Sequence, residues 1–325
     1  MLDVWLPLIG GLVLLVAGGD LLVRGAVRVA ERLGVSPLVI GLTLVGFGTS
    51  TPELVTSVQA ALAGSPGIAF GNIVGSNIAN ILLILGISAM LFPITVSSSA
   101  LSRDAMVMLG VAVTFAALSF LMPFGRLIGL VFVAALGVYI YLAFRQENVS
   151  AEHGAVYDKA AALEAADPAA TPGTGGRGGL VAPLLLAVGG LVLVVLGGRF
   201  LVGGAVALAQ SFGIPETVIG LTIVAVGTSM PELVTSVLAA FKRQSDLAFG
   251  NIVGSNIYNI LGIGGTTVLI APARVPQEIV TFDNLLMVAA SLLLVIFAAT
   301  GRRISRGEGA VFLAAYLAYL YVLWP

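Results

Sequence analysis

Ten apolar segments follow one another along the 325 residues, and several reach the roughly 20 residues that a helix needs to cross a bilayer. Charged residues make up only 10% of the chain, against about 25% in a typical soluble protein. So few charges could not cover the surface of a soluble protein of this size. The sequence therefore predicts an all-α polytopic membrane protein with ten transmembrane helices at 6–23, 36–63, 69–92, 104–122, 126–144, 180–202, 215–241, 247–271, 281–298 and 308–323.

The second half of the chain repeats the first at a constant offset of 179 residues. Residues 39–86 match 218–265 at 33 of 48 positions. Because each copy holds an odd number of spans, the second copy must enter the membrane from the opposite side, as in many secondary transporters. We therefore predict two inverted five-helix repeats, 1–144 and 180–325. The stretch between them, 145–179, is rich in Ala, Gly, Pro and charge, and we expect a flexible linker there.

The distribution of positive charge predicts the orientation in the membrane. If the N-terminus lies outside, 12 of the 15 Lys and Arg residues fall on one side. The positive-inside rule then makes the 145–179 linker cytoplasmic and puts both termini outside the cell. Trp5 and Trp324 would both lie at the outer interface. We expect a multi-pass protein of the plasma membrane.

Composition also excludes several function classes. The net charge of -1 offers no basic face for a nucleic acid, and the absence of cysteine removes thiol catalysis and cysteine-ligated metals. The only histidine, His153, lies in the polar linker, so histidine catalysis within the membrane is not expected. We expect no resident cofactor, and we identify no protein partner. The expected partners are the lipid bilayer and ions.

Each repeat carries one glutamate deep inside an apolar span. Glu53 lies in GLTLVGFGTSTPELVTSV and Glu232 in GLTIVAVGTSMPELVTSV. A charge at the centre of the bilayer costs roughly 3 kcal/mol on insertion scales, so such residues usually serve transport. Two glutamates at equivalent positions of an inverted repeat would meet near the midplane.

A proline precedes each glutamate and should break the helix. Pro52 and Pro231 lack an N–H and disfavour a helical residue before them, so spans 2 and 7 are predicted to be broken. A new half-helix can start at each proline, with the glutamate at its second position near the positive end of the helix dipole. The break also frees backbone carbonyls around Gly46–Phe47 and Ala225–Val226. Carboxylates, hydroxyls and carbonyls are oxygen ligands, which Ca²⁺ prefers and Na⁺ accepts.

A second duplicated motif, FGNIVGSNIAN at 70–80 and FGNIVGSNIYN at 249–259, predicts amide-lined helices. Residues spaced by four, such as Asn72, Ser76 and Asn80, form one polar stripe on a helix. Gly71 and Gly75 make a small-residue surface that lets a neighbouring helix approach closely. The equivalent residues 179 positions later repeat the pattern. We expect four of the amides to satisfy the broken backbone, namely Asn72, Asn77, Asn251 and Asn256.

With GTSTPELVTS and GNIVGSNIAN each duplicated, the chain resembles the prokaryotic type of the sodium/calcium exchanger family of cation/calcium antiporters. The resemblance covers nearly the whole chain except the linker. It implies that Glu53 and Glu232 are the central Ca²⁺ ligands and that exchange proceeds by alternating access. It also implies that the Na⁺ and Ca²⁺ sites are completed by Thr49, Ser50, Ser76, Asn80, Thr228, Ser229 and Ser255.

One position departs from the pattern of the family. Many members have an aspartate where this chain has Asn259, so the candidate site is lined by amides in both halves and has no third acidic group. Asn259 stays in the candidate ligand set with the carbonyls of Gly46 and Ala225. Without that acid, Na⁺, H⁺ and additional K⁺ coupling all remain open.

The favoured function is a secondary antiporter, not an enzyme, that exchanges Ca²⁺ for Na⁺ at the two glutamates. The alternative is a Ca²⁺/H⁺ or K⁺-assisted antiporter that uses the same residues. A passive cation channel is disfavoured, because channels generally place identical rings about an axis normal to the membrane. An intramembrane diglutamate hydrolase is conceivable, but nothing in the sequence indicates its substrate.

Overall fold

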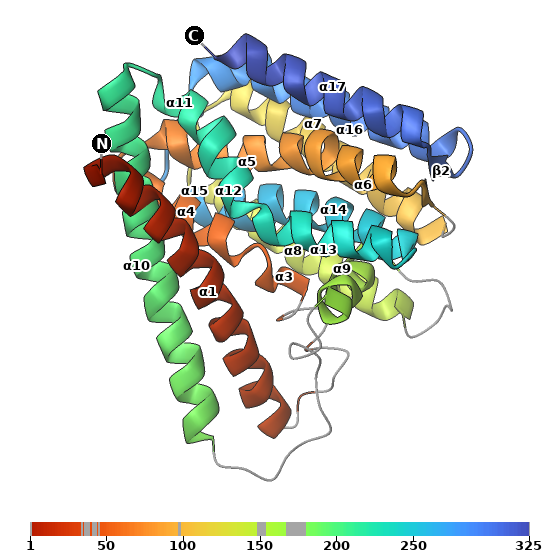
Figure 1. Ribbon diagram of the computed structural model, residues 1–325, viewed down its shortest axis with the longest axis horizontal. Helices are drawn as coiled ribbons and strands as arrows, with labels where there is room; N and C mark the ends of the chain where they lie inside the picture. Colours follow the sequence, from red (N-terminus) through yellow and green to blue (C-terminus); the bar gives the residue numbers. More distant parts are fainter. Residues whose placement is uncertain are drawn as a thin grey trace.

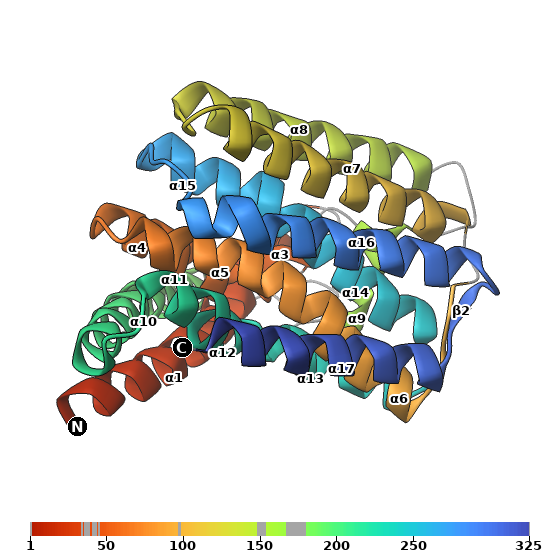
Figure 2. The ribbon, with the colours of Figure 1, turned by 90° about the horizontal axis from the view of Figure 1, so that it is seen from above.

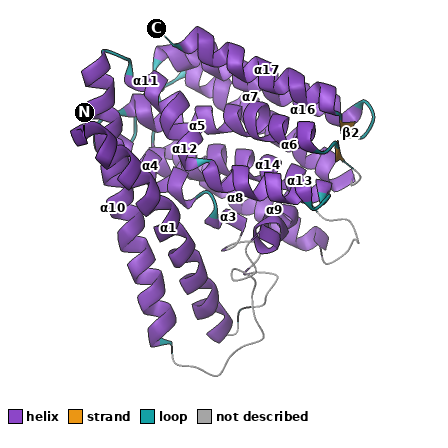
Figure 3. Ribbon diagram, viewed as in Figure 1, coloured by secondary structure: helices purple, strands orange, loops and turns teal. Residues whose placement is uncertain are grey.

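The protein is mainly helical in the residues that the computed structural model describes, which are 2–33, 35, 40, 44, 46–96, 99–147, 154–166 and 180–324. Within that part of the chain the strands are two residues long, β1 (Ile94–Thr95) and β2 (Arg303–Ile304) (Figure 3). Seven described helices are long and apolar enough to cross a membrane, and a bent pair of helices adds an eighth. The all-α membrane class is thereby confirmed. The count of ten stays a prediction, because the second expected span runs partly outside the described residues and the expected span at 308–323 is not among these helices.

Long helices alternate with short helical pieces in both halves of the chain. In order, the first half contains α1 (Leu2–Arg32), α3 (Gly46–Gly48), α4 (Thr51–Leu62), α5 (Pro66–Ala79), η2 (Asn80–Leu85), α6 (Gly86–Leu91), α7 (Ser99–Leu121) and α8 (Arg126–Glu147). After α9 (Ala155–Ala166) come α10 (Val181–Phe212), α11 (Glu216–Ile219), η4 (Gly220–Val224), α12 (Ala225–Thr228), α13 (Met230–Phe241), α14 (Ser245–Tyr258), η5 (Asn259–Gly264), α15 (Gly265–Ile270), η6 (Ile279–Asp283), α16 (Asn284–Ala299) and α17 (Arg306–Leu323). The elements labelled η are π-helical.

Two continuous helices form the centre of the molecule. One is α5–η2–α6 and the other is α14–η5–α15, and each contains one of the amide-rich motifs. Every residue of α5 from Gly67 to Ala79 is buried, because this helix packs against other helices on all sides. Both helices change from α-helical to π-helical at the last asparagine of the motif, which is Asn80 in the first and Asn259 in the second. Single π turns of this kind often occur at functional sites.

Helices α1 and α10 form a separate pair at one side of the bundle and run steeply across it (Figures 1 and 2). Their backbones approach closely through glycines spaced by seven residues. A Cβ added to Gly18 would lie 2.7 Å from the backbone nitrogen of Val194, and one added to Gly190 would lie 2.7 Å from the carbonyl oxygen of Gly18. Small residues at an interface of this kind allow close packing where no hydrophobic force drives helices together.

Short backbone pairings tie the two repeats together at both ends of the bundle. Strand β1 follows α6 and pairs antiparallel with β2, which precedes α17, with Ile94 opposite Ile304. On the other side, Phe124 and Ala273 form an isolated bridge. Each pairing joins two loops that the predicted topology assigns to the same side of the membrane.

Part of the expected flexible linker is an ordered helix. Within 145–179 the structure describes α9, and six of its residues are buried. The difference has a physical reason: the Ala-rich stretch favours helix, and α9 packs on α14, where Gly250 and Gly254 leave room for it. The remaining linker residues 148–153, including His153, and 167–179 lie outside the described residues.

Two equivalent aspartates have different partners in the two repeats. Asp104 in α7 accepts a hydrogen bond from the backbone N–H of Ala155, the first residue of α9, at 2.7 Å. Asp283, which is 179 positions later, accepts one from the hydroxyl of Tyr319 in α17 at 2.8 Å. Both aspartates are buried. The first repeat thus uses this carboxylate to hold the linker helix, and the second uses it to hold the last helix.

Candidate cation site

Both helices that carry the glutamates are broken where the sequence predicts. In the second repeat, the helical run Glu216–Thr228 ends before Ser229, and α13 continues at an angle of 49°. In the first repeat, a turn at Thr49 and Ser50 separates α3 from α4. Each new half-helix begins one residue before its proline, so the glutamate is the third residue and not the second as expected. It still lies in the first turn, where the helix dipole favours a carboxylate.

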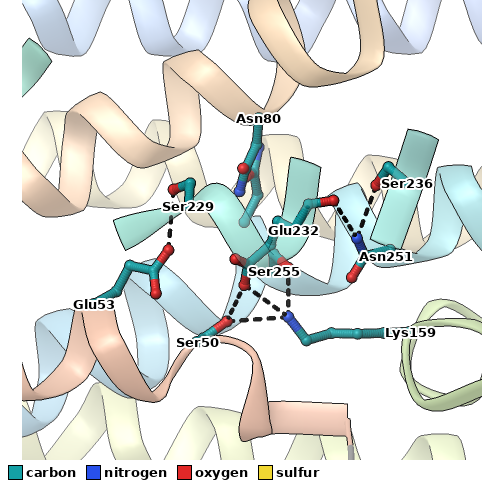
Figure 4. A network of polar contacts seen from close by, with 10 residues as sticks. Ser50, Glu53, Asn80, Lys159, Ser229, Glu232, Ser236, Asn251 and Ser255 are labelled. Carbon is teal, nitrogen blue, oxygen red and sulfur yellow. Dashed lines mark hydrogen bonds and ion pairs between the residues drawn. The ribbon is translucent and has the colours of Figure 1, made fainter. Parts of the chain in front are cut away.

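The two glutamates are held by reciprocal hydrogen bonds between the repeats (Figure 4). Ser50 donates from Oγ to Oε1 of Glu232 at 2.9 Å, and Ser229 donates from Oγ to Oε1 of Glu53 at 3.0 Å. All four side chains are buried, with at most 1% of their surface exposed. Each carboxylate therefore sits beside the break of the opposite repeat, and the two half-sites form one buried polar centre.

The amides of the central helices support the backbone of the two half-helices. Asn72 donates from Nδ2 to the carbonyl of Glu53 at 3.1 Å, and Asn251 does the same to the carbonyl of Glu232 at 3.3 Å. The same two amides also donate to Ser57 and Ser236. Both accepting carbonyls lie in the first turn of a half-helix, beyond the break, so the expectation that Asn72 and Asn251 satisfy the broken backbone stays a prediction.

The other two amides bond to carbonyls of the central helices. Asn77 donates to the carbonyl of Ile73 at 2.7 Å, one turn earlier in its own helix, and Asn256 donates to the carbonyl of Asn77 at 3.3 Å. In the described part of the chain both amide nitrogens donate to carbonyls of α5, so these contacts do not support the expectation that Asn77 and Asn256 satisfy the backbone at the breaks. The bond from Asn256 links the two central helices to each other.

Several buried oxygens of the site have no hydrogen-bond partner in the protein. A buried polar atom without a partner is costly, and such atoms often mark a ligand site. Within the described ranges there is no group of three or more His, Cys, Asp or Glu side chains suited to a metal, so the negative charge of the site rests on two carboxylates. Among the candidate ligands, the unpartnered oxygens are Oε2 of Glu53, Oε2 of Glu232, Oγ1 of Thr49, Oδ1 of Asn80 and Oδ1 of Asn259. This is the donor set that a hard cation prefers.

Other candidate ligands take part in the hydrogen bonds around the breaks. Thr228 donates to Oδ1 of Asn72 at 2.9 Å, and Ser76 donates to the carbonyl of Ala225 at 3.5 Å. Asn80 donates from Nδ2 to Oδ1 of Asn256 at 2.9 Å, which leaves its own oxygen unpartnered. The structure therefore brings these residues to the same region as the glutamates.

Comparison with known proteins assigns both halves of the chain to one family. The family described as "Sodium/calcium exchanger protein" matches residues 4–145 and again residues 182–324, which together are most of the chain. The chain belongs to the sodium/calcium exchanger family. It is a multi-pass membrane protein with one copy of the family's sequence pattern in each half.

Individual members of the exchanger family match over nearly their full length. The chain is 38% identical to sodium/calcium exchanger MaX1 of Methanosarcina acetivorans, over 98% of each chain. It is 37% identical to the putative antiporter CaxA of Alkalimonas amylolytica, over 97% of this chain and 96% of that one. A solved structure of the sodium-calcium exchanger NCX_Mj is 33% identical, covers 99% of both chains and has a TM-score of 0.62.

The expectation of free carbonyls at the breaks was wrong for two of them. The carbonyl of Ala225 was expected to be free of N–H partners, but it accepts a hydrogen bond from the backbone N–H of Ser229 at 3.1 Å. The carbonyl of Phe47 likewise accepts one from the N–H of Ser50 at 3.2 Å. The chain turns tightly at each break, so the gap in the helix is smaller than the prolines alone predict. Gly46 is the first residue of α3, the short helix that precedes the turn in the first repeat.

Sequence reasoning missed one charged residue of the site. Lys159 of α9 is 1% exposed, and its Nζ donates to Oγ of Ser50 at 3.0 Å and to Oγ of Ser255. It lies 3.7 Å from Oε1 of Glu232 (Figure 4). The available signal was indirect: Gly250 and Gly254 form a small-residue surface that needs a partner, and an Ala-rich helix is a suitable one.

Proposed function

We propose that this protein is a secondary active antiporter that exchanges Ca²⁺ for Na⁺ across the membrane at the two glutamates. The observation that carries the proposal is the reciprocal pairing of Glu53 with Ser229 and of Glu232 with Ser50, which leaves one oxygen of each buried carboxylate unpartnered. Family membership and the names of the relatives, sodium/calcium exchanger and antiporter, support it.

Charge balance supplies the coupling between the two ions. Two carboxylates carry a formal charge of −2, which one Ca²⁺ balances as well as monovalent cations do. Since both kinds of cation use the same oxygens, they exclude each other, and the empty site is unfavourable in the middle of the membrane. Alternating access then follows if the site opens to one side at a time. Ca²⁺ and Na⁺ are the cargo in this scheme, and no resident cofactor is required.

A second candidate is a Ca²⁺/H⁺ or K⁺-assisted antiporter. Asn259 favours it, because this buried amide stands where many family members have an acid and has no hydrogen-bond partner at either polar atom. A third of the chain is also 37% identical to human sodium/potassium/calcium exchanger 5. In the proton-coupled version, Glu53 and Glu232 would carry protons as well as bind Ca²⁺.

We place the protein in the plasma membrane with both termini outside and the linker in the cytoplasm. The excess of Lys and Arg on the linker side supports this orientation. The two pairings between loops, β1–β2 and the Phe124–Ala273 bridge, agree with the assignment of the spans, because each joins loops that share a side in either orientation.

The proposal is tested by Ca²⁺ uptake into proteoliposomes loaded with Na⁺. Matched vesicles contain choline in place of Na⁺, and a third set carries an imposed pH gradient. Uptake that needs internal Na⁺ is the expected result. Uptake that follows the pH gradient and ignores Na⁺ would assign the protein to the proton-coupled candidate, and uptake that needs neither gradient would contradict antiport.

A further inference from the structure

The small-residue surfaces of the two central helices have different partners, although the sequence duplicates them. Gly71 and Gly75 of α5 face η4 and α12 of the other repeat: a Cβ on Gly75 would lie 2.8 Å from Cβ of Ala225. On α14, the equivalent Gly250 and Gly254 face α9 instead. A Cβ on Gly254 would lie 3.3 Å from Cδ of Lys159. Helix α9 therefore packs on the second repeat. The corresponding place on the first repeat is taken by η4 and α12, which belong to the broken helix of the second repeat.

Docking α9 in this place puts an ammonium group among the oxygens of the candidate cation site. Lys159 Nζ donates to Ser50 and to Ser255 and lies 3.7 Å from Glu232. Ser50 is the same hydroxyl that donates to Glu232. A lysine ammonium is a compact cation with three donors, so it can satisfy oxygens that would otherwise bind a metal ion. Burying it costs free energy that only such partners offset.

Groups at both ends of α9 hold it in place. At its start, the N–H of Ala155 donates to the carboxylate of Asp104, and near its end the carbonyl of Ala165 accepts a hydrogen bond from Nζ of Lys242 at 2.6 Å. The second contact is exposed, so it contributes little stability and opens easily. The far end of α9 also forms a wall of a cavity of about 480 Å³ that reaches the breaks at Thr49, Pro52 and Pro231.

We propose that α9 is a tethered blocker, in which the ammonium of Lys159 competes with the transported cations for Ser50, Ser255 and Glu232. The idea rests on the proposed function, because it assigns these oxygens to cation binding. With α9 docked, the linker side of the site is occupied and transport is off. A rise in Ca²⁺ or Na⁺ on that side displaces Lys159, and α9 leaves the site.

The transport test uses Lys159→Met, which removes the charge and keeps a long side chain. If Lys159 occupies the site about nine-tenths of the time, the substitution should lower the apparent KM for Ca²⁺ about tenfold and change kcat little. Asp104→Ala removes an anchor of α9 without touching the site and should act in the same direction. Glu164→Gln, on the same helix, is the matched control and should behave as wild type. An unchanged KM in both test variants, or loss of uptake in folded Lys159→Met, would overturn the proposal.

A second measurement does not depend on transport, because the chain has only two lysines, Lys159 and Lys242. In membranes washed free of Ca²⁺ and Na⁺, an amine-reactive ester should modify exposed Lys242 rapidly and Lys159 slowly, as mass spectrometry can measure. Added Ca²⁺ should speed the modification of Lys159 far more than that of Lys242, which is exposed already and contacts only the end of α9. If Lys159 and Lys242 are modified at equal rates without ions, α9 is not docked. If Ca²⁺ leaves the modification rate of Lys159 unchanged, Lys159 does not compete with Ca²⁺.

The two measurements separate the possible failures. Protection of Lys159 that Ca²⁺ relieves, together with no exchange against Na⁺ or H⁺, would contradict the proposed function and support the competition. Exchange by wild type with a Lys159 that is never protected would support the function and overturn the blocker.

Discussion

Ser229 and Glu53 come from different repeats, and the hydroxyl of Ser229 donates to Oε1 of Glu53 at 3.0 Å in the centre of the protein. The equivalent residues 179 positions away, Ser50 and Glu232, form the same hydrogen bond at 2.9 Å. Each glutamate is thus positioned by the break of the other repeat. Movement of one repeat against the other must change both half-sites at once, which suits a transporter that opens to one side at a time.

Neutralising either glutamate should abolish Ca²⁺ transport. Glu53→Gln and Glu232→Gln each remove a buried charge that a cation needs as a partner, which is worth about 3 kcal/mol, or roughly 100-fold in affinity. Ca²⁺ uptake into proteoliposomes measures the effect, and size-exclusion elution shows that the variants stay folded. Exposed Glu278→Gln serves as the control. Normal uptake by either site variant would rule out the diglutamate site.

Equivalent glycines should tolerate a methyl group differently. In Gly75→Ala the new Cβ would meet Cβ of Ala225 at 2.8 Å inside the core, so we expect a loss of about 1–3 kcal/mol of stability from overpacking. In Gly254→Ala the new Cβ would meet Cδ of Lys159 at 3.3 Å, and α9 can shift away. Thermal unfolding in detergent should therefore show a lower melting temperature for Gly75→Ala than for Gly254→Ala. The reverse order would contradict the packing described for α9.

Replacing Asn259 by aspartate should change the coupling ratio. Asn259→Asp adds one negative charge to a site that holds two, so the bound cations must carry one more positive charge. The reversal potential of exchange in proteoliposomes reports this ratio. Asn259→Ser, which is neutral, is the control and should keep the wild-type ratio. An active Asn259→Asp variant with an unchanged ratio would place Asn259 outside the ion site.

Removing the hydroxyl of Tyr319 should destabilise the protein without touching the glutamates. Tyr319→Phe leaves the buried carboxylate of Asp283 without this donor, at a cost of about 1–3 kcal/mol and a few degrees in melting temperature. The control is Tyr321→Phe, because Tyr321 is 86% exposed. Equal melting temperatures for the two variants would show that the Asp283–Tyr319 bond adds no stability.

The sequence was sufficient to predict the helical class and the positions of the breaks. Pro52 and Pro231 end the regular helix in the way their chemistry requires, and an apolar span containing Glu53 or Glu232 indicates a polar centre. The reciprocal serine bonds could not be predicted in this way. An offset shows that Ser50 and Ser229 are equivalent, but it does not show which glutamate each one meets.

Two features of the site lay beyond sequence patterns. The π segments that begin at Asn80 and Asn259 keep the apolar character of the helices around them, so periodicity does not reveal them. Lys159 lies in an Ala-rich stretch within a linker whose Gly, Pro and charge content led us to expect flexibility. Its burial depends on a partner surface on α14 that is about 90 residues away in the chain. Long-range packing, which no local rule describes, decides where this lysine lies.

A duplicated chain has two half-sites but a single connector between its halves, and α9 belongs to that connector. Duplication gave Glu53 and Glu232 equivalent surroundings, because each repeat supplies the same residues. Helix α9, which contacts Ser255 through Lys159, has no second copy that could contact Ser76. The two halves of such a protein have the same origin, but the connector contacts their half-sites unequally. Changes in the connector can tune one half-site while the pattern shared by both repeats stays intact.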